Sequence, residues 1–263
     1  MPKAAPCVAL TIAGSDSGGG AGIQADLKTF QRFGVYGTSA VTLVTAQNTV
    51  GVWGVELLSP EFIVQQIAAV TEDFDVRAAK TGALGSAEII EAVAAALEQH
   101  APAHLVVDPV MISKHGDSLL DPSAVDALKA HLLPRASLVT PNLHEAGALL
   151  GRPVASEAEM RDAARAAFDL GAAAALVKGG HLPGGEAVDL LYSGSEFVRF
   201  AAPRIDTPHT HGTGCTYSAA IVALLARGET LLDAVGAAKA FISRAISGAP
   251  GIGHGQGPVD HSA

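Results

Sequence analysis

A short apolar run, a glycine-rich loop and a helical pattern follow one another at the start of the chain. Val8–Ala13 is apolar and suits a buried strand, and residues 14–22 are rich in glycine. Apolar residues then recur at helical spacing over 23–33. A buried strand that turns directly into a helix is the repeating unit of α/β proteins, so this opening already favours a layered fold with a parallel sheet.

The same alternation continues along the chain. Further strands are predicted over 35–46, 50–58, 77–80, 104–107, 137–140 and 173–177, and helices over 60–74, 87–99, 122–131, 157–170 and 231–247. Two late runs, 187–192 and 196–201, flank Ser193-Gly194-Ser195 and predict an antiparallel pair. The pattern predicts an α/β fold in one domain, residues 1–263, with a central, mostly parallel sheet and helices on both faces.

Composition and charge exclude several classes of function. Apolar residues make up 49% of the 263 residues, the net charge is −9, and no basic cluster is present, which argues against nucleic acid or an anionic membrane as a partner. No apolar run reaches the roughly 20 residues that a membrane span needs. The first residues do not resemble a signal peptide, and Cys7 and Cys215 form no disulfide framework. We therefore expect a cytoplasmic protein.

The first glycine loop does not match the common nucleotide-binding motifs. No Gly-Lys-Ser/Thr follows its glycines, so it is not a phosphate-binding P-loop. Residues 20–25 formally fit the dinucleotide pattern, but the next strand ends at Ala46-Gln47-Asn48 without the acidic residue that holds a ribose. A dinucleotide-dependent oxidoreductase is the least favoured reading.

Polar side chains stand where predicted strands end. Gln47, Asp108, Asn142 and Lys178 each occupy such a position. Because the carboxyl ends of parallel strands share one edge of a sheet, these four residues are expected to line a single cleft.

Each of these residues also has a simpler explanation. Gln47 suits ordinary turn chemistry with Asn48. Asn142 and Glu145 have the spacing of a helix capping box, in competition with a role as oxygen ligands of Mg²⁺. Asp26, early in the first helix, suits a solvated charge that favours the helix dipole.

The stretch His211–Ala220 carries the clearest chemical signal. A Gly/Thr turn leads directly into an apolar helical pattern, which places free backbone N–H groups and the positive end of a helix at Gly212–Cys215. This is an anion site, and the dipole is expected to lower the pKa of the Cys215 thiol. The competing explanation is a glycine-rich helix start with a small buried cysteine.

Together these residues supply what a phosphotransferase that uses ATP requires. Gly212–Cys215 offers N–H groups to a γ-phosphoryl group, and Lys178 offers a cation. Asp108 and Glu145 are candidates to hold Mg²⁺ through water, and Cys215 is placed to act as a base.

At this point the chain resembles a known family. The motifs that carry the resemblance are 13–16, 19–30, 46–49, 108–111, 140–145, 178–181, 211–216 and 253–258. In combination and in this order they look like the hydroxymethylpyrimidine/phosphomethylpyrimidine kinases of thiamine biosynthesis, in the ribokinase-like superfamily. One departure is Ser17-Gly18, where the family is expected to carry Pro-Ser. The glycines themselves are kept.

The resemblance implies a ribokinase-like fold and two successive phosphorylations, of a pyrimidine alcohol and of its monophosphate. Gln47 is implied to hydrogen-bond the aminopyrimidine, since its amide both donates and accepts. Asp26 and Gly14 are implied to lie nearby, and Val110 to form part of the wall. Cys215 is implied to replace the aspartate base of the related sugar kinases.

The resemblance also implies where ATP binds. Its phosphates are expected over Gly212, Thr213 and Gly214, near Asn142 and Lys178, with Lys239 close to the nucleotide. The remaining implied features are Mg²⁺, a lid at Lys114, His115 and Gly116, and a homodimer.

Two rival functions remain open. A pyridoxal/pyridoxine kinase shares the glycine turn with its cysteine, although Gln47 and the N-terminal glycine motif favour the pyrimidine. A non-catalytic sensor of pyrimidines or nucleotides is the other, and the intact Cys215, Asp108 and Glu145 speak against it.

Overall fold

The computed structural model describes residues 5–111 and 122–263. Its centre is a nine-stranded sheet in the order β3-β2-β1-β4-β5-β6-β7-β8-β9. The strands are β1 Val8–Asp16, β2 Tyr36–Gln47, β3 Val52–Leu57, β4 Val76–Thr81, β5 His104–Val107, β6 Leu138–Val139, β7 Ala175–Lys178, β8 Glu186–Tyr192 and β9 Phe197–Pro203. In this order, the neighbours from β2 through β1, β4, β5 and β6 to β7 pair in parallel. The pairs β2–β3, β7–β8 and β8–β9 are antiparallel.

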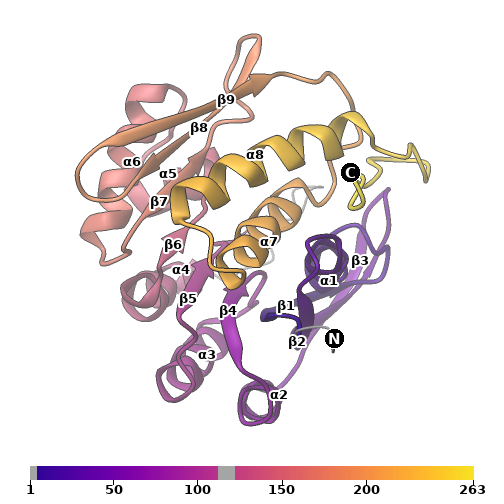
Figure 1. Ribbon diagram of the computed structural model, residues 1–263, viewed down its shortest axis with the longest axis vertical. Coiled ribbons are helices and arrows are strands. Elements are labelled where there is room, and N and C mark those ends of the chain that lie inside the picture. Colours follow the sequence, from indigo (N-terminus) through magenta and orange to yellow (C-terminus); the bar gives the residue numbers. More distant parts are fainter. Residues whose placement is uncertain (1–4, 112–121) are drawn as a thin grey trace.

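Helices cover both faces of the sheet (Figure 1). They are α1 Gly22–Arg32, α2 Pro60–Thr71, α3 Ala87–Gln99, α4 Pro122–Ala127, α5 Leu143–Leu150, α6 Glu157–Asp169, α7 Thr213–Ala226 and α8 Leu231–Ser247. One apolar core lies between the sheet and α2 to α6, and a second lies between the sheet and α1, α7 and α8. The predicted architecture is therefore confirmed, including the late antiparallel pair, which extends the same sheet.

Differences from the predicted elements concern their ends. The strand predicted over 137–140 is reduced to the two residues of β6. The helix predicted over 122–131 is α-helical only through Ala127 and continues as a π-helical turn, Leu128–Leu132, and a 3-10 turn, Leu133–Arg135. Pro134 has no N–H to donate and so ends the regular helical hydrogen bonding.

Helix α7 is the most enclosed element. All residues from Thr216 to Ala226 are buried, because α7 packs against the sheet on one side and against α1 and α8 on the others. A helix that is apolar all round belongs in a protein interior. Its position is consequently fixed from several directions, and its first turn, at the carboxyl edge of the strands, inherits that rigidity.

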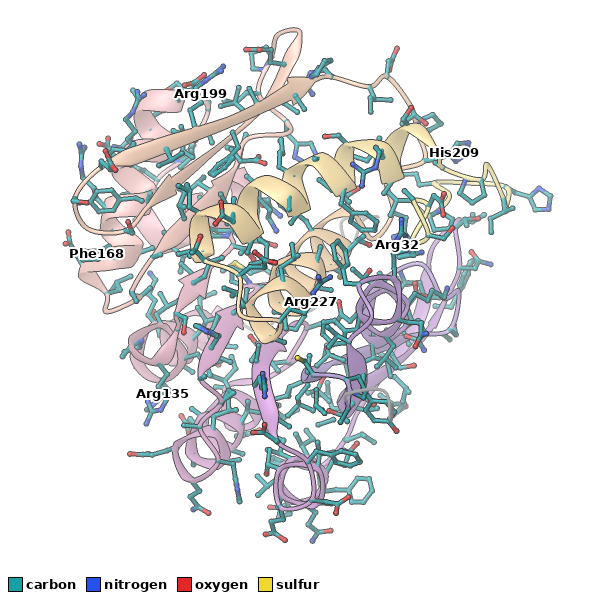
Figure 2. All side chains as sticks on the ribbon, in the orientation of Figure 1. Arg32, Arg135, Phe168, Arg199, His209 and Arg227 are labelled. Atoms are coloured by element: carbon teal, nitrogen blue, oxygen red, sulfur yellow. The ribbon has the colours of Figure 1, made fainter. Side chains whose placement is uncertain are left out.

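The chain's final residues return to the first helix. The Arg32 guanidinium at the end of α1 donates to the backbone carbonyls of Ser262 and Ala263, 2.9 and 3.1 Å away (Figure 2). Before that, the tail crosses the start of α7, where His211 and Pro258 form an isolated parallel bridge.

One edge of the sheet is unusually apolar for a surface. Trp53 and Leu57 of β3 are 65% and 48% exposed, and Val55 between them is 40% exposed. Among the described residues, no helix is both long and apolar enough to cross a membrane.

Candidate active site

The four polar strand ends do lie along one edge, but in two groups. Asp108, Asn142 and Lys178 follow or end the adjacent strands β5, β6 and β7. Gln47 ends β2, and strands β1 and β4 separate it from that group. The prediction of a shared edge is confirmed, and the ends of β1 and β4 lie between the two groups along it. That the four residues line one cleft remains a prediction.

Asp108 and Lys178 form the first group. The Lys178 ammonium lies 3.0 Å from Asp108 Oδ1, which also accepts from the Thr140 hydroxyl, while Asp108 Oδ2 accepts from the Ser218 hydroxyl at 3.0 Å. Burial alone would raise the pKa of Asp108, but Lys178 and Lys80 hold it below its ordinary value. Both groups are therefore charged at neutral pH.

The glycine turn meets this group directly. A Cβ atom on Gly214 would lie only 3.3 Å from the Lys178 nitrogen and 3.9 Å from Asp108 Oδ2. The missing side chain leaves the backbone N–H groups of the first turn of α7 beside a fixed cation. That combination suits a phosphate group, as the sequence predicts.

The capping box predicted for Asn142 and Glu145 is present, and a role as Mg²⁺ ligands remains a prediction. The Asn142 side chain accepts from the backbone N–H groups of His144 and Glu145, and the Glu145 carboxylate accepts from Asn142 N at 2.7 Å, so the capping box is present. Glu145 is nevertheless buried close to Lys178 and Asp108. Burial raises its pKa to about 7 despite the nearby Lys178 ammonium. The Glu145 side chain is therefore partly protonated and partly ionised near neutral pH.

Asp26 is not a solvated helix charge. Its side chain is fully buried, as is that of Lys80, and the two are joined at 2.7 Å. The Thr11 hydroxyl donates to its other oxygen at 2.6 Å. The pKa of Lys80 is raised, because Asp26, Cys215 and Asp108 together outweigh the effect of burial. The expectation of a solvated residue was wrong because the helix face that carries Asp26 packs onto β1 and β4.

Cys215 lies near this pair, and its thiol differs from the prediction. It is partly buried and free. Burial raises its pKa to about 11, and Asp26 and Asp108 add to the effect, whereas Lys80 and a backbone hydrogen bond from Gly22 only partly oppose it. The expected lowering by the helix dipole was wrong, since the dipole cannot compensate for the loss of water and two nearby carboxylates.

Gly212 caps α7 in a left-handed conformation, with φ of 77°. A Cβ atom there would collide with the carbonyl oxygen of Gly20, so the two glycine loops touch backbone to backbone. Thr213, the first residue of α7, donates its hydroxyl to the Thr210 carbonyl at 2.7 Å. The contact with Gly20 and the positive φ together exclude a larger residue at Gly212.

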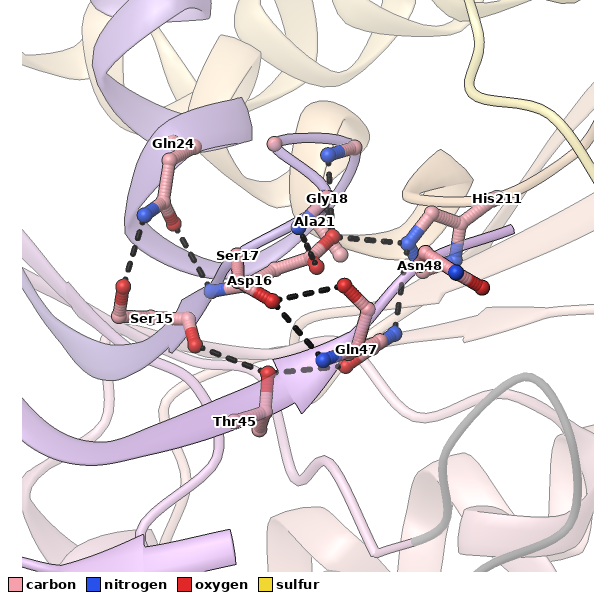
Figure 3. Close-up of polar contacts among 12 residues, drawn as sticks. Ser15, Asp16, Ser17, Gly18, Ala21, Gln24, Thr45, Gln47, Asn48 and His211 are labelled. Atoms are coloured by element: carbon pink, nitrogen blue, oxygen red, sulfur yellow. Dashed lines mark hydrogen bonds and ion pairs between the residues drawn. The ribbon is translucent and has the colours of Figure 1, made fainter. Parts of the chain in front are cut away.

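The first glycine loop folds around the Asp16 carboxylate (Figure 3). Gly18 N donates to Oδ1 at 2.8 Å, and Gly20 N and Ala21 N donate to Oδ2 at 3.0 and 2.9 Å. His211 Nε2 lies 2.9 Å from the same Oδ2. These donors keep the pKa of Asp16 below its ordinary value although burial opposes them.

Gly14 fills a packing role beside this loop. A Cβ atom there would lie 2.6 Å from Leu43 Cδ1, and its carbonyl is packed against Gly22. Val110, which follows β5, is half-buried and donates its N–H to the Asp108 carbonyl at 2.9 Å. The predicted roles of both in binding a substrate remain predictions.

Hydrogen bonds hold the backbone of Gln47, whereas its side-chain amide makes only long polar contacts. Its N–H and carbonyl both bond the Ser17 hydroxyl, at 2.8 and 2.7 Å. The side-chain oxygen lies 3.3 Å from the Thr45 hydroxyl, whose proton has a nearer acceptor, Ser15 O, at 3.0 Å. The side-chain nitrogen lies 3.5 Å from His211 Nε2. The carboxamide is therefore free to exchange both kinds of hydrogen bond with a ligand.

Lys239 lies behind the site. Its ammonium is 2.7 Å from Asp189 Oδ2, and Asp189 Oδ1 accepts from Gly179 N at 3.1 Å. Lys239 thus supports the loop that follows Lys178 through Asp189, and its predicted contact with a nucleotide remains a prediction.

Arg204 holds the same loop from outside. Its guanidinium donates to the carbonyls of Gly180, Leu182, Gly184 and Glu186. The predicted lid residues Lys114, His115 and Gly116 lie outside the described residues.

Reasoning from the sequence alone missed several residues at this edge. Lys80 ends the strand predicted over 77–80 and so carried the same signal as the four strand ends that were selected. Asp16 and His211 lie within motifs that were selected, but neither was given a role. Nothing in the local sequence indicated that Asp189 would support Gly179 from the neighbouring strand.

The raised pKa of Cys215 makes a direct prediction. In a Cys7→Ser protein without ligands, about one thiol in a thousand should be ionised at pH 8. Alkylation by iodoacetamide should then be about 100-fold slower than for a free cysteine and rise about tenfold per pH unit up to pH 10. Rates followed by mass spectrometry test this. A plateau below pH 8.5 would instead indicate a thiol activated by the helix dipole.

Comparison with known proteins identifies a family for this chain. A model of the family described as phosphomethylpyrimidine kinase matches residues 16–260. The hydroxymethylpyrimidine/phosphomethylpyrimidine kinase of Rhizobium meliloti is 55% identical over 257 residues, which cover 97% of this chain and 96% of the relative. The thiamine biosynthesis bifunctional protein ThiED of Geobacter sulfurreducens is 51% identical, and the match spans 96% of this chain but only 51% of that protein.

Solved structures give the same fold. An ADP complex of Bacillus subtilis pyridoxal kinase is 41% identical, with a TM-score of 0.92 and 98% of each chain covered. The fold is therefore close to that of a pyridoxal kinase, and the sequence is similar to those of the pyrimidine kinases. On the match over 16–260 and the identity to the relatives, the chain belongs to the phosphomethylpyrimidine kinase family.

Proposed function

We propose that this ATP-dependent kinase phosphorylates 4-amino-5-hydroxymethyl-2-methylpyrimidine to its monophosphate, and then the monophosphate to the diphosphate, in thiamine biosynthesis. The observation that carries the proposal is the arrangement along one edge. A free carboxamide stands at one end, Gln47, and a fixed cation beside a helix start, Lys178 with Gly214, stands at the other. An alcohol and a triphosphate can meet between them.

At the phosphate end, the backbone N–H groups of Gly212, Thr213 and Gly214 receive the transferring phosphoryl group. Lys178 neutralises part of its charge, and its pairing with Asp108 holds the ammonium in place before ATP arrives. Asn142 and Lys239 complete the nucleotide side, Lys239 chiefly through the loop that contains Gly179.

The two carboxylates near Lys178 fit a hydrated Mg²⁺ ion. No cluster of three or more His, Cys, Asp or Glu side chains occurs in the described part of the chain, so the protein alone does not enclose the ion. Magnesium commonly keeps its waters and binds one or two carboxylates together with substrate phosphates. Asp108 and Glu145 suit that role, and the ion would neutralise charge on the phosphates.

At the pyrimidine end, Gln47 donates to a ring nitrogen and accepts from the amino group. Asp26 acts through its buried pair with Lys80, which places a charged group beneath the substrate without exposing it to water. Gly14 and Val110 shape the walls.

Cys215 takes the proton of the alcohol. As the hydroxymethyl oxygen bonds to the γ-phosphorus, its proton passes to the thiolate sulfur, and ADP leaves with the electrons of the broken bond. Since the free enzyme holds a neutral thiol at neutral pH, the thiolate forms only as a minor species. Lys80 is the cation that favours it.

A coupled assay of ADP formation tests the assignment. With ATP and Mg²⁺, the wild-type enzyme should turn over the pyrimidine alcohol and its monophosphate, and the alcohol should give a higher kcat/KM than pyridoxal. The near identity of fold with pyridoxal kinase makes pyridoxal the second candidate. A higher kcat/KM for pyridoxal would select that function, and no ADP with any acceptor would revive the non-catalytic sensor.

The two phosphorylations should differ in their need for Cys215. The alcohol must lose a proton during attack, whereas the monophosphate oxygen is already anionic, its second pKa being about 6. Cys215→Ala should therefore lower kcat for the alcohol by about 10²–10⁴-fold and affect the monophosphate much less. Steady-state kinetics with both acceptors measure this. Equal losses would show that Cys215 serves both reactions alike.

We also propose that the enzyme is a cytoplasmic homodimer of one-domain subunits, residues 1–263. Its two cysteines are free, as a reducing compartment requires. The exposed apolar side chains of β3 are the surface a second copy would cover, because such a patch is costly in water.

The dimer can be tested on this surface. Trp53→Glu should give a monomer in analytical ultracentrifugation at micromolar concentration. Leu232→Glu is the matched control, because Leu232 is 49% exposed on α8, away from β3. A wild-type monomer, or a dimer in both variants, would contradict the placement.

A further inference from the structure

His211 is bonded to the ionised carboxylate of Asp16 and to nothing else through its ring. The distance from Nε2 to Asp16 Oδ2 is 2.9 Å, and the ring's other nitrogen, Nδ1, is buried without a hydrogen-bond partner. An ionised carboxylate only accepts hydrogen bonds, so the proton of the imidazole must be on Nε2. Asp16 thereby selects the tautomer.

This tautomer determines whether His211 and the Gln47 side chain can form a hydrogen bond. The Gln47 side-chain nitrogen lies 3.5 Å from His211 Nε2, but both nitrogens are donors, so no bond links them. His211 therefore does not hold the carboxamide that faces the substrate. Its effect on the reaction must pass through Asp16 and the backbone.

A continuous set of contacts runs from Gln47 to the glycine turn (Figure 3). The Ser17 hydroxyl bonds both backbone groups of Gln47. Asp16, the preceding residue, gathers the N–H groups of the loop and accepts from His211. His211 precedes Gly212, the cap of α7. The end of β2 and the start of α7 are thus joined by hydrogen bonds through one imidazole.

Packing makes this imidazole hard to replace. A Cβ atom on Gly20 would lie 2.5 Å from His211 Cδ2 and 3.0 Å from Pro258 Cβ, so the loop lies flat against the ring. The His211 backbone is itself fixed by the tail, since it donates to Gly257 O at 3.1 Å and accepts from Val259 N at 3.2 Å. The ring has one available position.

We propose that His211 is a positioning residue, which sets the separation between the acceptor end of the cleft and the Gly212–Cys215 turn without touching either substrate. The inference rests on the proposed function, because it assumes that acceptor and phosphoryl donor bind at these two ends. Phosphoryl transfer depends steeply on that separation, since a displacement of about 1 Å can cost about 10²-fold in rate.

The test compares the effect of a substitution on kcat with its effect on the dissociation constants of the two substrates. His211→Ala should lower kcat by about 30–100-fold, while the dissociation constants of ATP and of the alcohol, each measured alone by calorimetry, change less than about threefold, as expected for a role in geometry and not in contact. His211→Gln should recover most of kcat, because its side-chain N–H can reach Asp16. His131→Ala, which replaces a half-buried histidine in the turn Leu128–Leu132, is the matched control.

Asp16→Asn provides an independent arm. It removes the negative charge that faces His211 and, with its amide oxygen toward the three donors at Oδ2, turns its NH2 group toward Gly18 N, so it should lower kcat as His211→Ala does. The double variant should be no more than about threefold below the worse single variant, because both changes weaken the contact between His211 and Asp16. Additive losses, a parallel loss of affinity for either ligand, or no recovery in His211→Gln would overturn the proposal.

The choice of acceptor and an NMR measurement distinguish a failure of this inference from a wrong assignment of the substrate. The kinetic constants are measured with whichever of the pyrimidine alcohol and pyridoxal the wild type phosphorylates faster, so an error in the substrate leaves the test intact. In addition, ¹⁵N NMR of the histidine rings should show the His211 proton on Nε2 and a changed signal in Asp16→Asn. A proton on Nδ1 would overturn the proposal whatever the activity.

Discussion

The buried ion pair between Lys80 and Asp26 is the interaction on which the site depends most. Both side chains are completely removed from solvent, and they join β4 to α1. Leaving either charge without its partner in such a place costs about 3–5 kcal/mol. The folded state therefore depends on keeping the two charges together. The pair also affects the ionisation of the Cys215 thiol. The ammonium favours a thiolate at Cys215, whereas the carboxylate opposes it.

That balance explains why a helix start is not enough to activate a cysteine. The first turn of α7 offers N–H groups, but the sulfur is partly buried among carboxylates, and burial has the larger effect on its pKa. A reactive thiol in the resting enzyme would be exposed to oxidation and alkylation. A thiol that stays protonated near neutral pH avoids this hazard.

The sequence was most informative where a local pattern and a topological rule coincide. Asp108, Asn142 and Lys178 were predictable because strand ends in a parallel sheet share an edge. Lys80 ends a predicted strand and follows the same rule, although no role is predicted for it from the sequence. The role of His211 could not be read from the sequence, because it depends on contacts with Asp16, 195 residues away. The pKa of Cys215 depends in the same way on carboxylates from other elements.

The enclosure of α7 has a consequence for how such enzymes change. The helix that presents the glycine turn is buried along Thr216–Ala226, so almost any alteration of its orientation would disturb the core between the sheet and α1, α7 and α8. Gln47, by contrast, stands at the end of a strand near the edge of the sheet, next to the exposed β3. Substitutions at that rim would leave the packing of α7 unchanged. One end of the edge can therefore vary while the other stays fixed, in a fold that also occurs in a pyridoxal kinase.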